Sequence, residues 1–142
     1  MFVSVGLFAI VGIYIGAQQF GSGSADRLDL IPGEEKPWMI EVVNVAGEDG
    51  LAQRTTAYLR SLGYDVVDYH SRPLAGHERT MLIDRRGNIA AAEDLARTLG
   101  LPPERVVTEL DRTLYVDVTV VVAYDYRSFA SLKHLKNIKD TP

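Results

Sequence analysis

The sequence predicts an α/β domain, in which two helices cover one mixed sheet of about five strands, preceded by one N-terminal transmembrane helix. Short runs rich in β-branched residues alternate with segments whose apolar residues recur at helical spacing, which is typical of an α/β sandwich. Residues 2 to 17 contain no charged side chain, which predicts the membrane helix. We therefore divide the chain into an anchor (1–20), a flexible linker (21–38), a folded domain (39–126) and a basic, flexible tail (127–142).

The first predicted unit of the domain is a strand, a helix and a second strand. "MIEVVNV" (39 to 45) is short and rich in β-branched residues, which suits a buried strand. Apolar residues recur at helical spacing from 50 to 62, and Gly63 follows as a stop signal. Residues 64 to 69 then form a strand, so the unit has parallel strands and a right-handed crossover.

A second unit with the same order follows. "RTMLID" (79 to 84) is a predicted strand, and the turn signal "RRGN" leads into a helix over 88 to 99 that Gly100 ends. "RVVTEL" (105 to 110) and "YVDVTVVVAY" (115 to 124) are further strands. The last is the most apolar stretch of the domain, which predicts a central position in the sheet.

The apolar N-terminal segment is just long enough to span a bilayer. Residues 2 to 20 would form a helix of about 28 Å against a hydrocarbon core of about 30 Å. A cleavable signal peptide is the alternative, because Gly23 and Ala25 are small residues of the kind a signal peptidase reads. The basic segment that such peptides carry at their start is absent, which favours the anchor.

Charge and cysteine content exclude several functions. Residues 39 to 126 carry 14 acidic and 9 basic side chains, so the folded part repels nucleic acid. The absence of cysteine excludes disulfides, thiolate zinc sites and thiol catalysis.

The turn "NVAGEDG" (44 to 50) raises the question of a phosphate site. A dinucleotide-binding turn needs three glycines, whereas only Gly47 and Gly50 are present. Glu48 and Asp49 would place negative charge where the phosphate should lie, and they suit instead the first turn of the following helix. We interpret the turn as a structural corner that Asn44 fixes through local backbone hydrogen bonds, and we predict no cofactor.

Other candidate groups give no convincing catalytic or metal site. His70 and His77 lie in a predicted loop without the spacing of metal ligands, so we expect solvated side chains and no metal. Asp117 and Asp125 would be separated by about 26 Å along one strand. Asp84 and Asp125 both follow apolar strands, so a carboxylate pair there would be the basis of an enzymatic alternative.

The remaining candidates are surface groups. Arg85 and Arg86 occupy the "DRRGN" turn, where they could contact an anionic polymer or simply be exposed charge. We predict no catalytic residue. The ligand-binding candidates are Asn44, Gly47, Gly50, Arg85, Arg86 and Asp125.

Three segments in order resemble the LytR C-terminal domain family over residues 39 to 126. They are "VVNVAGEDGLAQRTTAYLRSLGYDV", "TMLIDRRGNIAAAEDLARTLGL" and "DVTVVVAYDY". The sequence departs from the family pattern at Val45, where glycine often follows the asparagine, and at Ala123, which replaces a glycine. The resemblance implies an extracytoplasmic setting in the bacterial cell envelope, often with one membrane helix. Many relatives place this domain after a LytR/CpsA/Psr catalytic domain, whereas here we expect the accessory module alone.

From these observations we expect a single-pass protein of the cell membrane with its domain on the extracytoplasmic side. Its predicted role is to bind a partner protein or a wall polymer without catalysis. The alternative is a small envelope hydrolase or transferase that uses carboxylates at strand ends. Self-association is a third option, through Gly12 and Gly16 of the apolar segment and an exposed sheet edge.

Overall fold

The computed structural model describes residues 37–73 and 76–137. The predicted anchor, and the predicted linker up to residue 36, lie outside these residues. None of the helices in the described part of the chain has the length and apolar character needed to cross a bilayer.

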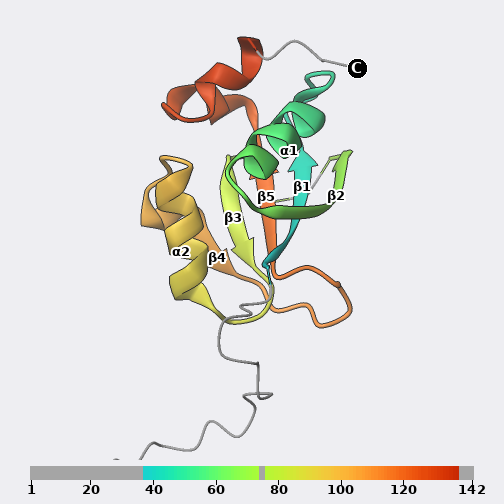
Figure 1. The fold of residues 1–142 in the computed structure, drawn as a ribbon, viewed down its shortest axis with the longest axis vertical. Helices are drawn as coiled ribbons and strands as arrows, with labels where there is room; N and C mark the ends of the chain where they lie inside the picture. Colours follow the sequence, from blue (N-terminus) through green and yellow to red (C-terminus); the bar gives the residue numbers. More distant parts are fainter. Residues whose placement is uncertain (1–36, 74–75, 138–142) are drawn as a thin grey trace, which may run out of the picture. The chain divides into compact units, whose positions relative to one another are not determined.

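Five strands form one mixed sheet in the order β2-β1-β5-β3-β4. β1 is parallel to both β2 and β5, whereas β3 is antiparallel to β5 and parallel to β4. The predicted mixed sheet and the central position of the last strand are thus confirmed (Figure 1). The bounds are β1 (Met39–Asn44), β2 (Asp65–Ser71), β3 (Met81–Asp84), β4 (Val106–Thr108) and β5 (Val118–Val122).

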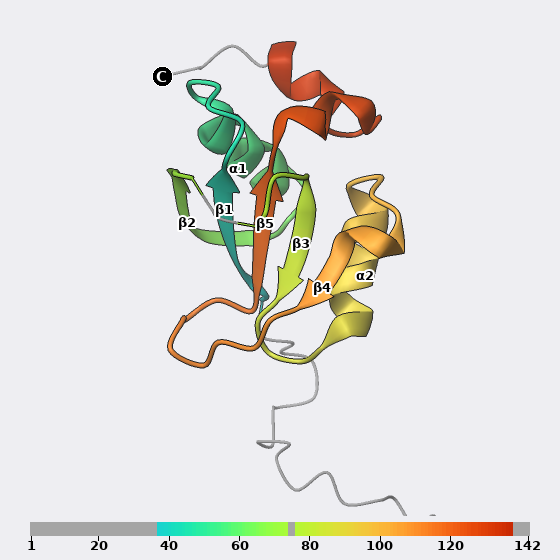
Figure 2. The ribbon, with the colours of Figure 1, turned by 180° about the vertical axis from the view of Figure 1, so that it is seen from behind.

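Both helices lie on the same face of the sheet, as the views from the two sides agree (Figures 1 and 2). α1 (Leu51–Ser61) connects the parallel strands β1 and β2, and α2 (Ile89–Thr98) connects β3 and β4. The side chain of Asn88 accepts a hydrogen bond from the backbone N–H of Ala91 and caps α2. The predicted sandwich of helices on a mixed sheet is confirmed, and no helix from the described part of the chain covers the second face of the sheet.

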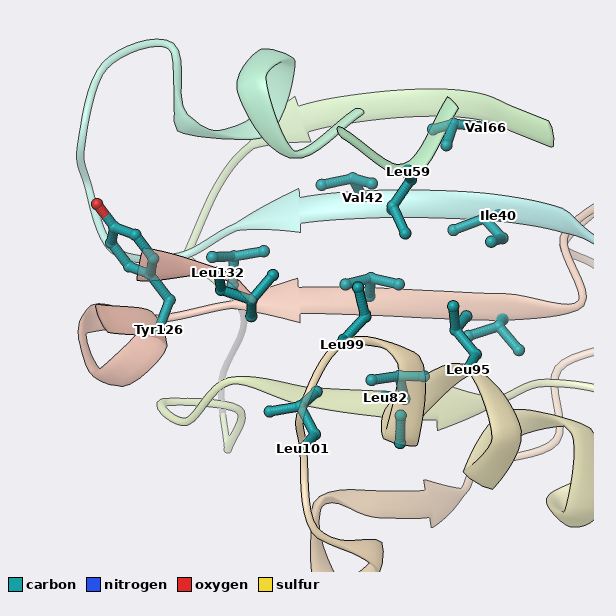
Figure 3. Close-up of a cluster of buried hydrophobic side chains, with 14 of the residues drawn as sticks. Ile40, Val42, Leu59, Val66, Leu82, Leu95, Leu99, Leu101, Tyr126 and Leu132 are labelled. Carbon is teal, nitrogen blue, oxygen red and sulfur yellow. The ribbon is translucent and has the colours of Figure 1, made fainter. Parts of the chain in front are cut away.

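The hydrophobic core fills the space between the helices and the sheet (Figure 3). Alternate residues of the central strands face it, because successive side chains of a strand point to opposite sides. From β1 these are Ile40 and Val42, both fully buried, and α2 contributes Leu95 from the opposite layer.

The prediction of a flexible tail is wrong for its described part, residues 127 to 137. After β5 the chain forms two short 3-10 helices, η2 (Tyr124–Ser128) and η3 (Lys133–Asn137), in addition to η1 (Pro103–Arg105) before β4. Leu132 and Leu135 are fully buried in the same core as Tyr126, and η3 contacts α1. The apolar residues of the tail therefore complete the core of the domain.

Candidate functional site

A buried carboxylate and its polar partners lie on the face of the sheet that no described helix covers, the face turned toward the viewer in Figure 2. Glu41 lies between the core residues of β1, so its side chain points to this second face. The register places Glu41 beside Asp68 of β2 and Thr119 of β5. Only 6% of Glu41 is exposed, so a carboxylate is buried in the middle of the face.

Hydrogen bonds and ion pairs connect this carboxylate, through Thr119 of β5, to side chains that follow the ends of β3 and β4. Thr119 donates from its hydroxyl to Glu41 Oε2 over 2.9 Å and accepts from Arg85 Nε over 3.0 Å. Arg85 Nη1 lies 3.3 Å from Glu109 Oε2, and His77 Nε2 lies 3.3 Å from Glu109 Oε1. Arg85 is thus a member of a largely buried polar network rather than an exposed turn residue.

The edge of the same face holds a second group of charges. His70 Nε2 lies 3.6 Å from Glu41 Oε1, and His70 Nδ1 lies 3.5 Å from Asp68 Oδ2. Arg72 Nη2 lies 3.9 Å from Glu41 Oε1, with about half of its side chain exposed. The interpretation as solvated loop residues is wrong for His70, which belongs to β2. His77 does lie in a loop, as predicted, but only 15% of its side chain is exposed.

An open pocket of about 280 Å³ adjoins this group at the carboxyl ends of β1 and β2. Its lining is Asn44, Val45, Gly47, Ser71, Arg72 and Pro73. The side chain of Asn44 donates to the carbonyl of Glu48 and to the hydroxyl of Ser71, and it accepts from the backbone N–H of Ala46. These bonds confirm the role predicted for Asn44, that of fixing the corner after β1.

The glycines of this corner have left-handed backbone conformations. Gly47 has φ +68° and Gly50 has φ +72°, which side chains with a Cβ rarely adopt. Gly47 lines the pocket, whereas Gly50 immediately precedes α1. The structural use of the two glycines agrees with the interpretation as a corner.

The sequence predicted that Glu48 and Asp49 lie in the first turn of α1. This prediction is wrong, because the helix begins at Leu51. Glu48 instead accepts hydrogen bonds from Arg54, Arg127 and Tyr126 at 2.7 to 3.0 Å. Burial raises the pKa of Glu48, but the bonds from Arg127 and Tyr126 and the nearby arginine charges outweigh it and hold this pKa below its ordinary value. Glu48 therefore ties the corner to the C-terminal segment.

The pair of Asp84 and Asp125 on which the enzymatic alternative depends does not form. β3 is antiparallel to β5, so Asp84 lies beside Val118 at the beginning of β5, whereas Asp125 follows the end of that strand. Asp84 is fully buried and accepts from the backbone N–H groups of Arg86 and Gly87. The two carboxylates belong to opposite ends of the sheet.

Asp125 has structural partners of its own. It accepts from the backbone N–H of Thr80 over 2.7 Å and from Arg105 Nη1 over 2.7 Å. Burial raises its pKa, but the bonds from Thr80 and Arg105 outweigh this effect and hold the pKa below its ordinary value.

The six sequence-predicted binding candidates therefore do not converge on one place. Asn44 and Gly47 line the pocket, and Arg85 belongs to the network of the helix-free face. Arg86 donates to the carbonyl of Leu114 and lies 3.5 Å from Asp117. The sequence analysis did not select Glu41, His70, Thr119 or Glu109 as binding candidates. Two of them could have been found, because a polar residue inside an apolar strand is unusual: Glu41 in "MIEVVNV" and Thr119 in "VTVVV".

Comparison with known proteins now identifies the family. The family described as "LytR cell envelope-related transcriptional attenuator" matches residues 39–126. The chain belongs to this family. Membership in the LytR C-terminal domain family indicates a cell-envelope-related accessory module. The chain is also similar to the solution structure of the C-terminal domain of Rv0431, with 28% identity, a TM-score of 0.43, and coverage of 61% of this chain and 73% of that chain. None of the curated proteins matches it.

Proposed function

We propose that the protein is an accessory module of the cell envelope that is tethered to the membrane by residues 1 to 20 and binds a wall polymer or partner protein on the extracytoplasmic side. The family supports the envelope setting, and the uncharged N-terminal run supports the tether. The proposed role is recognition without catalysis.

The observation that carries this proposal is the position of Arg72 at the rim of the pocket. The pocket lies at the carboxyl ends of the parallel strands β1 and β2. The backbone N–H of Arg72 donates to the carbonyl of Asn44, which fixes the main chain while about half of the side chain remains exposed. A guanidinium so placed suits a carboxylate or phosphate group of the ligand.

The enzymatic alternative loses the feature on which it rested. It required a pair of carboxylates at neighbouring strand ends, and Asp84 and Asp125 lie at opposite ends of β5. Each is also engaged by backbone N–H groups, Asp84 within its turn and Asp125 at Thr80. Binding is therefore the function that the geometry supports best.

The proposal can be tested by crosslinking in cells that express the full-length protein, followed by capture and identification of bound proteins and glycan fragments. Arg72→Ala should lose most of the captured ligand. Arg97→Ala is the matched control, because Arg97 is an exposed arginine of α2 paired only with Asp94 among the described residues. Equal capture by wild type and Arg72→Ala would contradict the pocket as the binding site, and turnover of an envelope substrate by the purified protein would favour an enzyme.

A further inference from the structure

The buried Glu41 has incomplete compensation for its charge. Its Oε2 atom accepts one neutral hydrogen bond from Thr119, and the nitrogen atoms nearest Oε1, His70 Nε2 and Arg72 Nη2, are 3.6 and 3.9 Å away. Both distances exceed the range of a good N–H···O hydrogen bond, 2.7 to 3.2 Å. A carboxylate in this position would be stabilised by a cation closer to Oε1.

His70 presents an unused ligand atom to that carboxylate. Its Nε2 atom is shielded from solvent and has no hydrogen-bond partner among the residues that the structure describes. Zinc lies about 2.0 to 2.2 Å from nitrogen and carboxylate ligands, so two ligands of a tetrahedral ion are about 3.4 Å apart. The 3.6 Å between His70 Nε2 and Glu41 Oε1 matches this spacing.

Asp68 supplies a third group. Its Oδ2 atom lies 3.5 Å from Nδ1, the second nitrogen of the His70 ring. Ligand atoms of Glu41, Asp68 and His70 can be chosen that all lie within 4.8 Å of one another. The exposed Asp68 carboxylate can bind the ion itself or hold the ring through Nδ1, as outer carboxylates do in zinc sites.

We propose that Glu41, His70 and Asp68 form a binding site for a divalent transition-metal ion such as Zn²⁺. The imidazole and the two carboxylates are the ligand types that zinc accepts, and the edge position of β2 provides access from solvent. Arg72 Nη2 lies 3.9 Å from Glu41 Oε1, and about half of its side chain is exposed, so the guanidinium has room to turn toward solvent. Binding requires the neutral imidazole, so the ion replaces any proton on Nε2.

The test is equilibrium dialysis of the metal-stripped, full-length protein against ZnCl₂, with bound zinc measured by mass spectrometry. His70→Gln should weaken binding at least about tenfold, as should Asp68→Asn on the exposed surface. His77→Gln is the matched control, because His77 also lies beside a carboxylate, that of Glu109. Wild type and this control should bind one ion per chain with equal affinity.

A spectroscopic measurement gives an independent result. Co²⁺ in place of Zn²⁺ should give visible d–d absorption that is present in wild type and His77→Gln and absent in His70→Gln. Unchanged zinc affinity in both His70→Gln and Asp68→Asn would overturn the proposal. Loss of binding in His77→Gln with retention in His70→Gln would overturn it equally, and so would a lack of saturable binding in wild type.

Discussion

The replacement Leu132→Ala provides a direct measure of how far the C-terminal segment belongs to the folded domain. Leu132 is fully buried and lies in the core beside Tyr126 (Figure 3). The change removes three carbon atoms from this environment, a loss of about 2.4 kcal/mol at about 0.8 kcal/mol for each buried carbon group. The cavity that remains adds to this loss, so the free energy of unfolding should fall by about 2.5–5 kcal/mol.

Thermal unfolding should reveal the same change. A domain of about 100 residues loses about 4 °C of Tm for each kcal/mol, so Leu132→Ala should unfold on the order of 10–20 °C below wild type. Urea denaturation followed by tryptophan fluorescence measures the free energy itself, since Trp38 packs against the core.

The control is Lys133→Ala, the neighbouring residue with an exposed side chain, which should change the free energy by at most about 0.5 kcal/mol. If Leu132→Ala were as mild as this control, the segment after β5 would not be packed on the core in solution. The original expectation of a flexible tail would then be correct.

Three further predictions concern charge, a buried turn and the anchor. Because the pKa of Glu48 is lowered in the folded state, its contribution to stability is present above its unfolded pKa near 4.5 and is lost as the pH falls through the folded value. Urea denaturation of Glu48→Gln should therefore show a shallower loss of stability in acid than wild type, and equal slopes would contradict this assignment. Asp84→Ala leaves the backbone N–H groups of Arg86 and Gly87 without their acceptor and should cost about 2–4 kcal/mol in urea denaturation, more than Asp84→Asn. Full-length protein should sediment with membranes and resist carbonate extraction, whereas a chain starting near Gly21 should be soluble; an intact mature protein that is soluble and begins near Asp26 would support the cleaved signal peptide.

Local patterns were sufficient to predict the order of strands and helices in the domain. The β-branched run of β1, the helical spacing from 50 to 62 and the glycine stop at Gly63 each determine one element by short-range chemistry. The direction of β3 could not be obtained in this way, because its pattern is the same in a parallel or an antiparallel pairing. The sequence therefore left open a pair of Asp84 and Asp125, which the antiparallel direction of β3 and β5 places at opposite ends of the sheet.

The candidate site depended on information that a linear pattern does not contain. Glu41 and Thr119 are 78 positions apart, and only the β1–β5 register places them in contact. His70 was assigned to a loop because the strand prediction ended at Tyr69, two residues before β2 ends. The spacing of Leu132 and Leu135 can be read from the sequence. The part of the core that these two side chains cover is known only from the folded structure.

The position of β5 has a consequence for how the chain folds. The last strand to be synthesised lies between β1 and β3, so the two crossover units meet in the sheet only through it. Until residues 118 to 122 have been made, β1 and β3 each keep an unpaired apolar edge, and neither half can close the sheet. Such late, long-range pairing raises the contact order, which slows folding and delays closure of the sheet until β5 has been made. A nascent chain released before β5 would therefore expose aggregation-prone edges instead of forming half of a stable domain.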